Sequence, residues 1–113
     1  MPPKKNPLNL NPLQMKTLTL MQYLAKLPEH RAETDEGVEI SRLPHPHGDH
    51  FHLGHVVVAT RDASGLGNQA VWTALERKGL IKSAFPSSAV VTPAGLAYDT
   101  EALREQILHA SHH

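Results

Sequence analysis

The sequence predicts a small α+β domain, and three observations support this class. A segment that begins at Asn11 carries apolar residues at helical spacing, and a second capped segment begins at Asn68. Between them, residues 38–43 alternate in polarity and Val56, Val57 and Val58 form a β-branched run, as strands do. The 113 residues and a hydrophobic content of 40% fit one domain with one core.

Composition narrows the function classes. Lys plus Arg and Asp plus Glu number 11 each, so the zero net charge gives no global attraction to nucleic acid or membrane, and DNA binding would depend on a local patch. Without cysteine, metal ligands are limited to His with Asp or Glu. We find no secretory signal and no apolar run of about 20 residues, and therefore expect a cytoplasmic protein.

The first helix is set by its capping sequence. Asn11 can cap it, Pro12 suits the first helical position, and Gln14 can close a capping box. Its apolar stripe comprises Leu13, Thr17, Leu20, Leu24 and Leu27 and ends before Pro28. Residues 1–10, rich in proline, are expected to form a disordered arm, residues 11–110 a single domain and residues 111–113 a flexible tail.

The middle of the chain predicts a loop over residues 29–37 and a strand over 38–43. Pro44, Pro46 and Gly48 then break regular structure, and extended chain resumes from Phe51 to about Thr60. We therefore expect residues 38–43 and 51–60 to form a β-hairpin with histidines around its turn. A loop over residues 61–67 should follow.

Asn68 can cap a second helix that continues to Lys78 and stops at Gly79. Residues 80–82 and 89–92 then predict a second hairpin, with its tip at residues 85–88. Thr92 and Pro93 begin another helix, which Asp99 or Thr100 restarts or continues as far as His109. This terminal helix either covers the core or pairs with a second copy.

This second helix and the hairpin after it resemble a known family. Residues 75–81 read Leu-Glu-Arg-Lys-Gly-Leu-Ile, and residues 92–95 read Thr-Pro-Ala-Gly. The stretch of about residues 68–97 resembles the recognition helix and wing of winged helix-turn-helix transcriptional regulators. The resemblance implies a winged-helix-like domain with an additional histidine-bearing β-hairpin, and it implies double-stranded DNA as a partner. A homodimer through the first or the last helix is also expected.

The polar residues of this helix fit such a role. Val71, Ala74 and Leu75 lie on one face and can pack on the domain, which turns the polar residues outward. The expected DNA contacts, to base edges and phosphates, are Asn68, Gln69, Thr73, Arg77, Lys78 and Lys82. The alternative is that these residues are only the solvated side of a surface helix. Residues 55–62 stand where the family has a supporting helix, whereas their valine run favours a strand; both remain open.

The densest chemical motif is a histidine run over residues 45–55. Its possible metal ligands are His45, His47, Asp49, His50, His52 and His55. On a strand His50 and His52 would share one face and meet on one ion; Zn²⁺ fits best, and Ni²⁺ or Cu²⁺ are alternatives. Equally, a loop rich in Pro and Gly tolerates histidines as solvated polar residues.

The sequence contains none of three common catalytic motifs, so we do not expect an enzyme. The chain lacks a Gly-x-Ser-x-Gly elbow, a phosphate-binding loop and a His-Glu-x-x-His helix. We therefore expect a DNA-binding transcriptional regulator that responds to metal through the His45–His55 loop. The alternative is a non-enzymatic metal-binding or protein-interaction module on the same scaffold.

Overall fold

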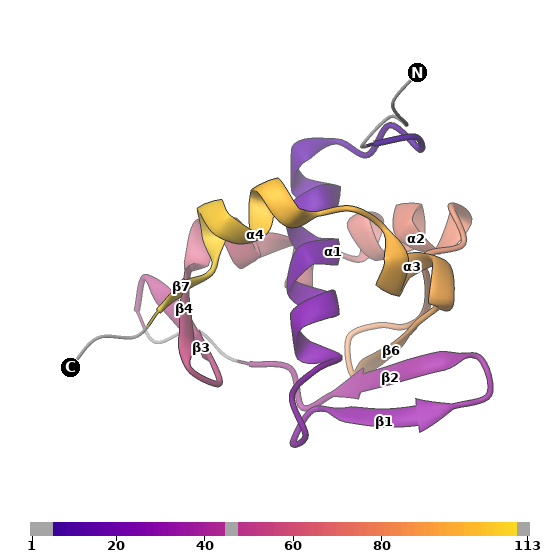
Figure 1. Cartoon of the computed structure of the whole chain (residues 1–113), viewed down its shortest axis with the longest axis horizontal. Helices are drawn as coiled ribbons and strands as arrows, with labels where there is room; N and C mark the ends of the chain where they lie inside the picture. Colours follow the sequence, from indigo (N-terminus) through magenta and orange to yellow (C-terminus); the bar gives the residue numbers. More distant parts are fainter. Residues whose placement is uncertain (1–5, 45–47, 111–113) are drawn as a thin grey trace.

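The computed structural model describes residues 6–44 and 48–110, which form helices and two antiparallel sheets (Figure 1). The α+β class is therefore confirmed. The elements in chain order are α1 (Pro12–Leu24), β1 (Arg31–Thr34), β2 (Gly37–Ser41), β3 (His50–Leu53), β4 (Val56–Ala59), the 3₁₀ helix η1 (Thr60–Gly67), α2 (Gln69–Arg77), β5 (Ile81–Ala84), β6 (Ser88–Val91), α3 (Pro93–Ala97), α4 (Glu101–Ile107) and β7 (His109–Ala110).

Helix α1 runs through the centre of the molecule, between the two sheets (Figure 1). Its predicted start is confirmed, because the Asn11 side chain accepts from the Gln14 N–H and the Gln14 side chain accepts from the Asn11 N–H. The predicted apolar stripe covers one face of α1, but α1 is buried on more than one face, since every residue from Thr17 to Gln22 is buried. This burial arises because η1, α2, α3 and α4 all contact α1.

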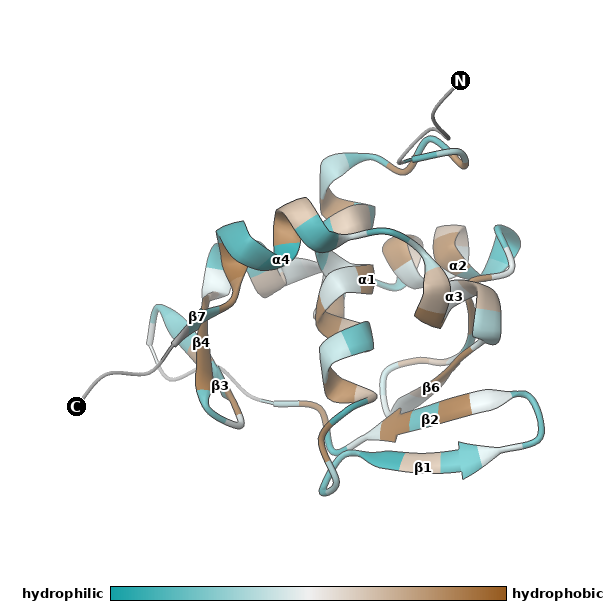
Figure 2. Cartoon of the chain, viewed as in Figure 1, coloured by the Kyte–Doolittle hydropathy of each residue, from teal (hydrophilic) through white to brown (hydrophobic). Residues whose placement is uncertain are grey.

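The larger sheet has the strand order β1-β2-β6-β5, and alternating hydrophobic and hydrophilic bands mark β2 (Figure 2). The predicted second hairpin is confirmed as β5–β6, which we call the wing, with Ile81 opposite Val91. The loop expected over residues 29–37 is wrong, because β1 pairs with β2 in a hairpin that places Thr34 opposite Gly37. The sequence shows no strand pattern for β1, because three of its four residues are exposed and no apolar residue needs to alternate toward the core.

The smaller sheet has the order β3-β4-β7. The hairpin predicted between residues 38–43 and 51–60 is wrong: β2 pairs with β1 and β6, whereas β3 pairs with β4 through a turn at Gly54 and His55. Gly54 adopts a φ of 58°, a left-handed conformation that glycine permits at a tight turn. Of the two alternatives for residues 55–62, the strand holds for Val56–Ala59; the loop expected over residues 61–67 is instead part of η1.

The remaining helices begin as predicted and end differently. Asn68 caps α2, and Gly79 follows it with a φ of 76°. Thr92 caps α3, and the chain restarts as α4 at Glu101. The expected end at His109 is wrong, because His109 pairs with Val57 and extends the smaller sheet as β7.

Residues 6–10, which the sequence assigns to the N-terminal arm, lie against the domain. Leu10 is buried, and the Asn6 side chain forms two hydrogen bonds of 2.9 Å with the Leu10 backbone. The Tyr98 hydroxyl donates to Asn6, and the Lys78 ammonium donates to the Leu8 carbonyl at 2.7 Å. The predicted arm residues 1–5 and tail residues 111–113 lie outside the described residues.

Candidate nucleic-acid interface and histidine face

The exposed side of α2 carries part of the predicted DNA-contact set. Val71, Trp72 and Leu75 are buried and fix the helix to the core. Gln69 and Arg77 are exposed and Thr73 is half-buried, so these three lie on the outward side. Within the described ranges neither Gln69 nor Arg77 has an ion pair or side-chain hydrogen bond in the structure. Both side chains are therefore available to a ligand.

The other three predicted contacts are engaged within the molecule. The Asn68 Oδ1 accepts from the Ala70 N–H at 3.0 Å as the cap of α2. Lys78 donates to the Leu8 carbonyl, and Lys82 pairs with Glu36 at 2.5 Å between Nζ and Oε2. The Glu36 and Lys82 side chains are both 56% exposed, so water screens this pair strongly.

The wing is fixed to α2 by two contacts. Phe85 packs edge-on against Trp72, with ring centroids 5.0 Å apart and an interplanar angle of 86°. The Ser83 N–H donates to Glu76 Oε2 at 2.9 Å, which joins β5 to the helix. Trp72 is fully buried and donates from Nε1 to the Gly65 carbonyl at 3.1 Å. These contacts hold α2, η1 and the wing as one unit.

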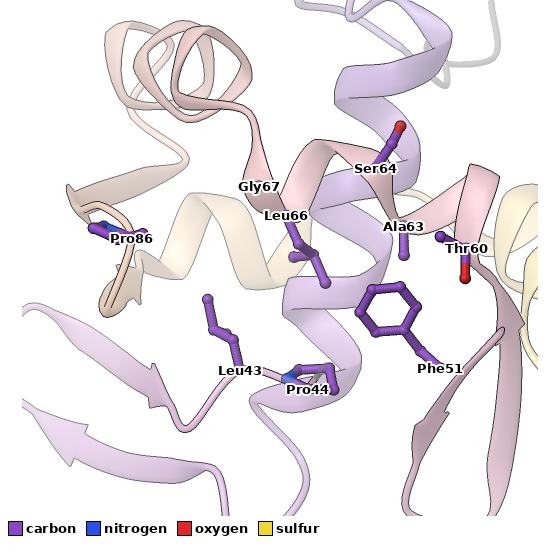
Figure 3. Close-up of a pocket in the computed structure, with 9 residues that line it drawn as sticks. All are labelled: Leu43, Pro44, Phe51, Thr60, Ala63, Ser64, Leu66, Gly67 and Pro86. Atoms are coloured by element: carbon purple, nitrogen blue, oxygen red, sulfur yellow. The ribbon is translucent and has the colours of Figure 1, made fainter. Parts of the chain in front are cut away.

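A cleft of about 320 Å³ separates the wing tip from η1 and β3 (Figure 3). The side chains of Leu43, Phe51 and Leu66 converge on it, and Pro86 borders it from the wing. The residues that line it are Leu43, Pro44, Phe51, Thr60, Ala63, Ser64, Leu66, Gly67 and Pro86. None of these described residues is ionisable, so the cleft walls offer no acid–base group.

No family is assigned. No protein-family model matches the chain, and neither a curated protein nor a solved structure is significantly similar to it. Among the described residues, no helix has both the length and the apolar character that a membrane crossing requires.

The described part of the histidine run lies on the hairpin β3–β4. His50 and His52 alternate with the buried Phe51 and Leu53, so both imidazoles lie on the outer face of the smaller sheet. Their Nε2 atoms are 3.1 Å apart, and the rings meet edge-on at 81°. The sequence prediction that these two imidazoles share a face and converge is confirmed.

Asp49 adds a carboxylate beside this pair. Its Oδ1 lies 3.2 Å from His50 Nδ1. The hydrogen bond from His50 lowers the pKa of Asp49 below its ordinary value, and a backbone hydrogen bond and the histidine charge act in the same direction. The Asp49 carboxylate is therefore placed to accept a hydrogen bond from His50 Nδ1.

The other predicted ligands are not part of this pair. His55 lies exposed in the turn between β3 and β4, and His45 and His47 lie outside the described residues. Across the ranges 6–44 and 48–110, no group of three or more His, Asp or Glu residues is placed to hold a metal ion. The prediction of a larger ligand set stays untested.

Sequence reasoning missed two residues near these sites. His109 joins the outer face of the smaller sheet because Val57 pairs with both His52 and His109. Glu36 reaches Lys82 from the β1–β2 turn. No local pattern marks either residue, since each is brought in by strand pairing over a long sequence separation.

The two helices predicted as dimer faces differ in exposure. Helix α1 is buried in the chain along most of its length. Helix α4 exposes Glu101, Ala102, Glu105 and Gln106, a mostly polar surface. The homodimer remains an expectation, and α4 has the larger exposed surface of the two helices.

Proposed function

We propose that the chain is a winged-helix DNA-binding domain that reads double-stranded DNA with α2 and contacts its backbone with the wing. The observation that carries this proposal is the exposed side of α2, with Gln69 and Arg77 unengaged beside an anchored wing. Gln can pair with adenine edges in the major groove, and Arg with guanine edges or phosphates. The resemblance of residues 68–97 to winged helix-turn-helix regulators supports the same function.

The element before α2 departs from the resembling family. In that family a supporting helix precedes the recognition helix, whereas here β4 takes up Val56–Ala59 of the corresponding residues and the 3₁₀ helix η1 leads into α2. Helix η1 packs closely on α1 because Gly65 lacks a side chain: a Cβ there would lie 1.8 Å from Thr17 Oγ1. Recognition of a DNA groove requires that α2 be held rigidly, and the packing of η1 against α1 and α2 contributes to this.

The charge distribution sets the expected strength. Glu76 lies beside Arg77 on α2, and Lys82 is paired with Glu36. Few positive charges are thus available to neutralise phosphates, so few counterions are released on binding. We therefore expect modest affinity with a shallow salt dependence.

The first experiment measures binding of a fluorescently labelled duplex of mixed sequence over a series of salt concentrations. Arg77→Ala should weaken binding roughly tenfold, or reduce the salt slope by about one if Arg77 contacts phosphate. Arg104→Ala removes the same charge from α4 and should leave binding unchanged. Equal losses in both variants, or no binding at the lowest salt, would contradict the proposal and favour the interaction module.

A second experiment uses the pair on the wing. Glu36→Gln removes the carboxylate that holds Lys82, so Lys82 becomes available to a phosphate. The variant should bind the duplex several-fold more tightly, with a salt slope steeper by about one. Glu105→Gln, which removes an equal charge from α4, is the matched control. Binding unchanged by Glu36→Gln would remove Lys82 from the interface.

A further inference from the structure

The outer face of the smaller sheet carries histidines that DNA binding through α2 does not use. Phe51 and Val58 face the core as a directly paired couple, whereas His50 and His52 point the other way. In a directly paired row, side chains share one face of the sheet. His52, Val57 and His109 form such a row, so His109 lies on the same face as His52, about 10 Å away across β4.

The distance between His50 Nε2 and His52 Nε2 suits a chelated metal ion. Imidazole nitrogens bind Zn²⁺ at about 2.0–2.1 Å. At that bond length, two ligand nitrogens lie about 2.9 Å apart at a right angle and about 3.3 Å apart at a tetrahedral angle. The observed 3.1 Å falls between these values. The two nitrogens are therefore already at the separation that one shared ion requires, and rotation of the rings would direct both at it.

Asp49 orients the first ligand. In the neutral tautomer of His50 whose Nδ1–H donates to the Asp49 carboxylate, Nε2 carries the lone pair that a metal ion needs, and this atom lies 3.1 Å from His52 Nε2. A carboxylate that holds the remote N–H of a histidine is the usual outer partner of a metal-binding imidazole.

We propose that His50 and His52 bind one divalent transition-metal ion through their Nε2 atoms, with Asp49 as the outer partner of His50. Two neutral imidazoles suit Zn²⁺, Ni²⁺ and Cu²⁺, of which Cu²⁺ binds most tightly to a given nitrogen site. Water fills the other positions of the ion, and His109, on the same sheet face about 10 Å from His52, lies outside the pair. The site does not rest on DNA binding and forms without DNA.

The test is a calorimetric titration of the 113-residue chain with Cu²⁺ and with Zn²⁺. His112 and His113 are replaced by serine in every sample, because adjacent terminal imidazoles bind metal themselves. One ion per chain is expected. His50→Ala and His52→Ala should each lower the affinity at least tenfold, whereas His55→Ala, on the same hairpin, should leave it unchanged. Equal binding by all three variants, or an equal loss in His55→Ala, would overturn the proposal.

Two further measurements separate a chelate from a histidine–histidine hydrogen bond. Electron paramagnetic resonance of the Cu²⁺ complex should show at least two nitrogen ligands, falling by one in His52→Ala. Asp49→Asn should weaken binding about tenfold, as removal of an outer-shell partner does. A single nitrogen ligand would overturn the proposal, and no change in Asp49→Asn would overturn the role of the carboxylate. If His50→Ala unfolds, His52→Asn at the more exposed position gives the same test.

Discussion

The buried side chain of Gln22 joins α1 to the segment between α3 and α4. Its Nε2 donates to the Gly95 and Tyr98 carbonyls, each at 2.8 Å, and its Oε1 accepts from the Thr100 hydroxyl. Gln22 is 4% exposed, so water cannot replace these partners. A polar residue inside an apolar helical segment gives no sequence signal for this role.

Gln22→Leu should lower the free energy of unfolding by about 3 kcal/mol, because it keeps the volume but leaves two carbonyls and a hydroxyl without a partner. Urea unfolding measures the change. Gln106→Leu, at an exposed position of α4, is the control and should change stability by less than about 0.5 kcal/mol. Equal effects would mean that water satisfies the groups around Gln22.

Gly65 is a position where η1 approaches α1 too closely for a side chain. Gly65→Ala should destabilise the protein by about 3 kcal/mol, because the added methyl group overlaps Thr17 and forces η1 outward. Gly67→Ala adds the same group where nothing lies within 4 Å and should be nearly neutral. Thermal unfolding compares the two. Gly65→Ala as stable as Gly67→Ala would show that η1 can shift freely.

At the scale of elements, the sequence predicted what local contacts determine. The caps Asn11, Asn68 and Thr92 each bind a backbone N–H within three residues, so their signal is contained in a few neighbouring residues. Strands without such signals failed. The residues of β1 and β7 are recruited by pairing with β2 and β4, and polar strand edges carry no alternation that a sequence pattern could show.

Substitutions of Asn68 can distinguish its role as the cap of α2 from its proposed contact with DNA. As a cap, Asn68→Ala should lower the free energy of unfolding by about 1 kcal/mol, whereas Asn68→Ser keeps a capping oxygen and should leave it nearly unchanged. Urea unfolding measures both variants. If Asn68 also contacts bases, Asn68→Ser should weaken duplex binding while stability is kept. Equal destabilisation by Ala and Ser would contradict the capping role.

At the scale of the whole molecule, the candidate sites were predictable only in part. The alternation around Phe51 was enough to place His50 and His52 together, because strand geometry is local. Alternation could not show that Lys82 meets Glu36, or that His109 lies on the same sheet face as His50 and His52. Both facts depend on how distant strands assemble. The engagement of Lys78 with the N-terminal segment depends equally on tertiary packing.

The two sheets share one hydrophobic core, in which Leu53 and Val58 of the smaller sheet join Ile40 and Val91 of the larger one. We therefore expect one cooperative unfolding transition. Trp72 fluorescence reports the α2 side, and the imidazole NMR signals of His52 report the smaller sheet; both should give the same midpoint. Leu53→Ala should lower both midpoints together and reduce the free energy of unfolding by about 3 kcal/mol, because the residue is only 1% exposed.

Leu96→Ala, at a residue 39% exposed, is the matched control and should leave both midpoints nearly unchanged. A fall in the histidine midpoint alone would instead mean that the smaller sheet unfolds separately from α1 and the wing. Metal bound at His50 and His52 would then stabilise only that sheet. With one shared core, metal must raise the Trp72 midpoint as well, because a ligand that binds only the folded state stabilises the whole cooperative unit.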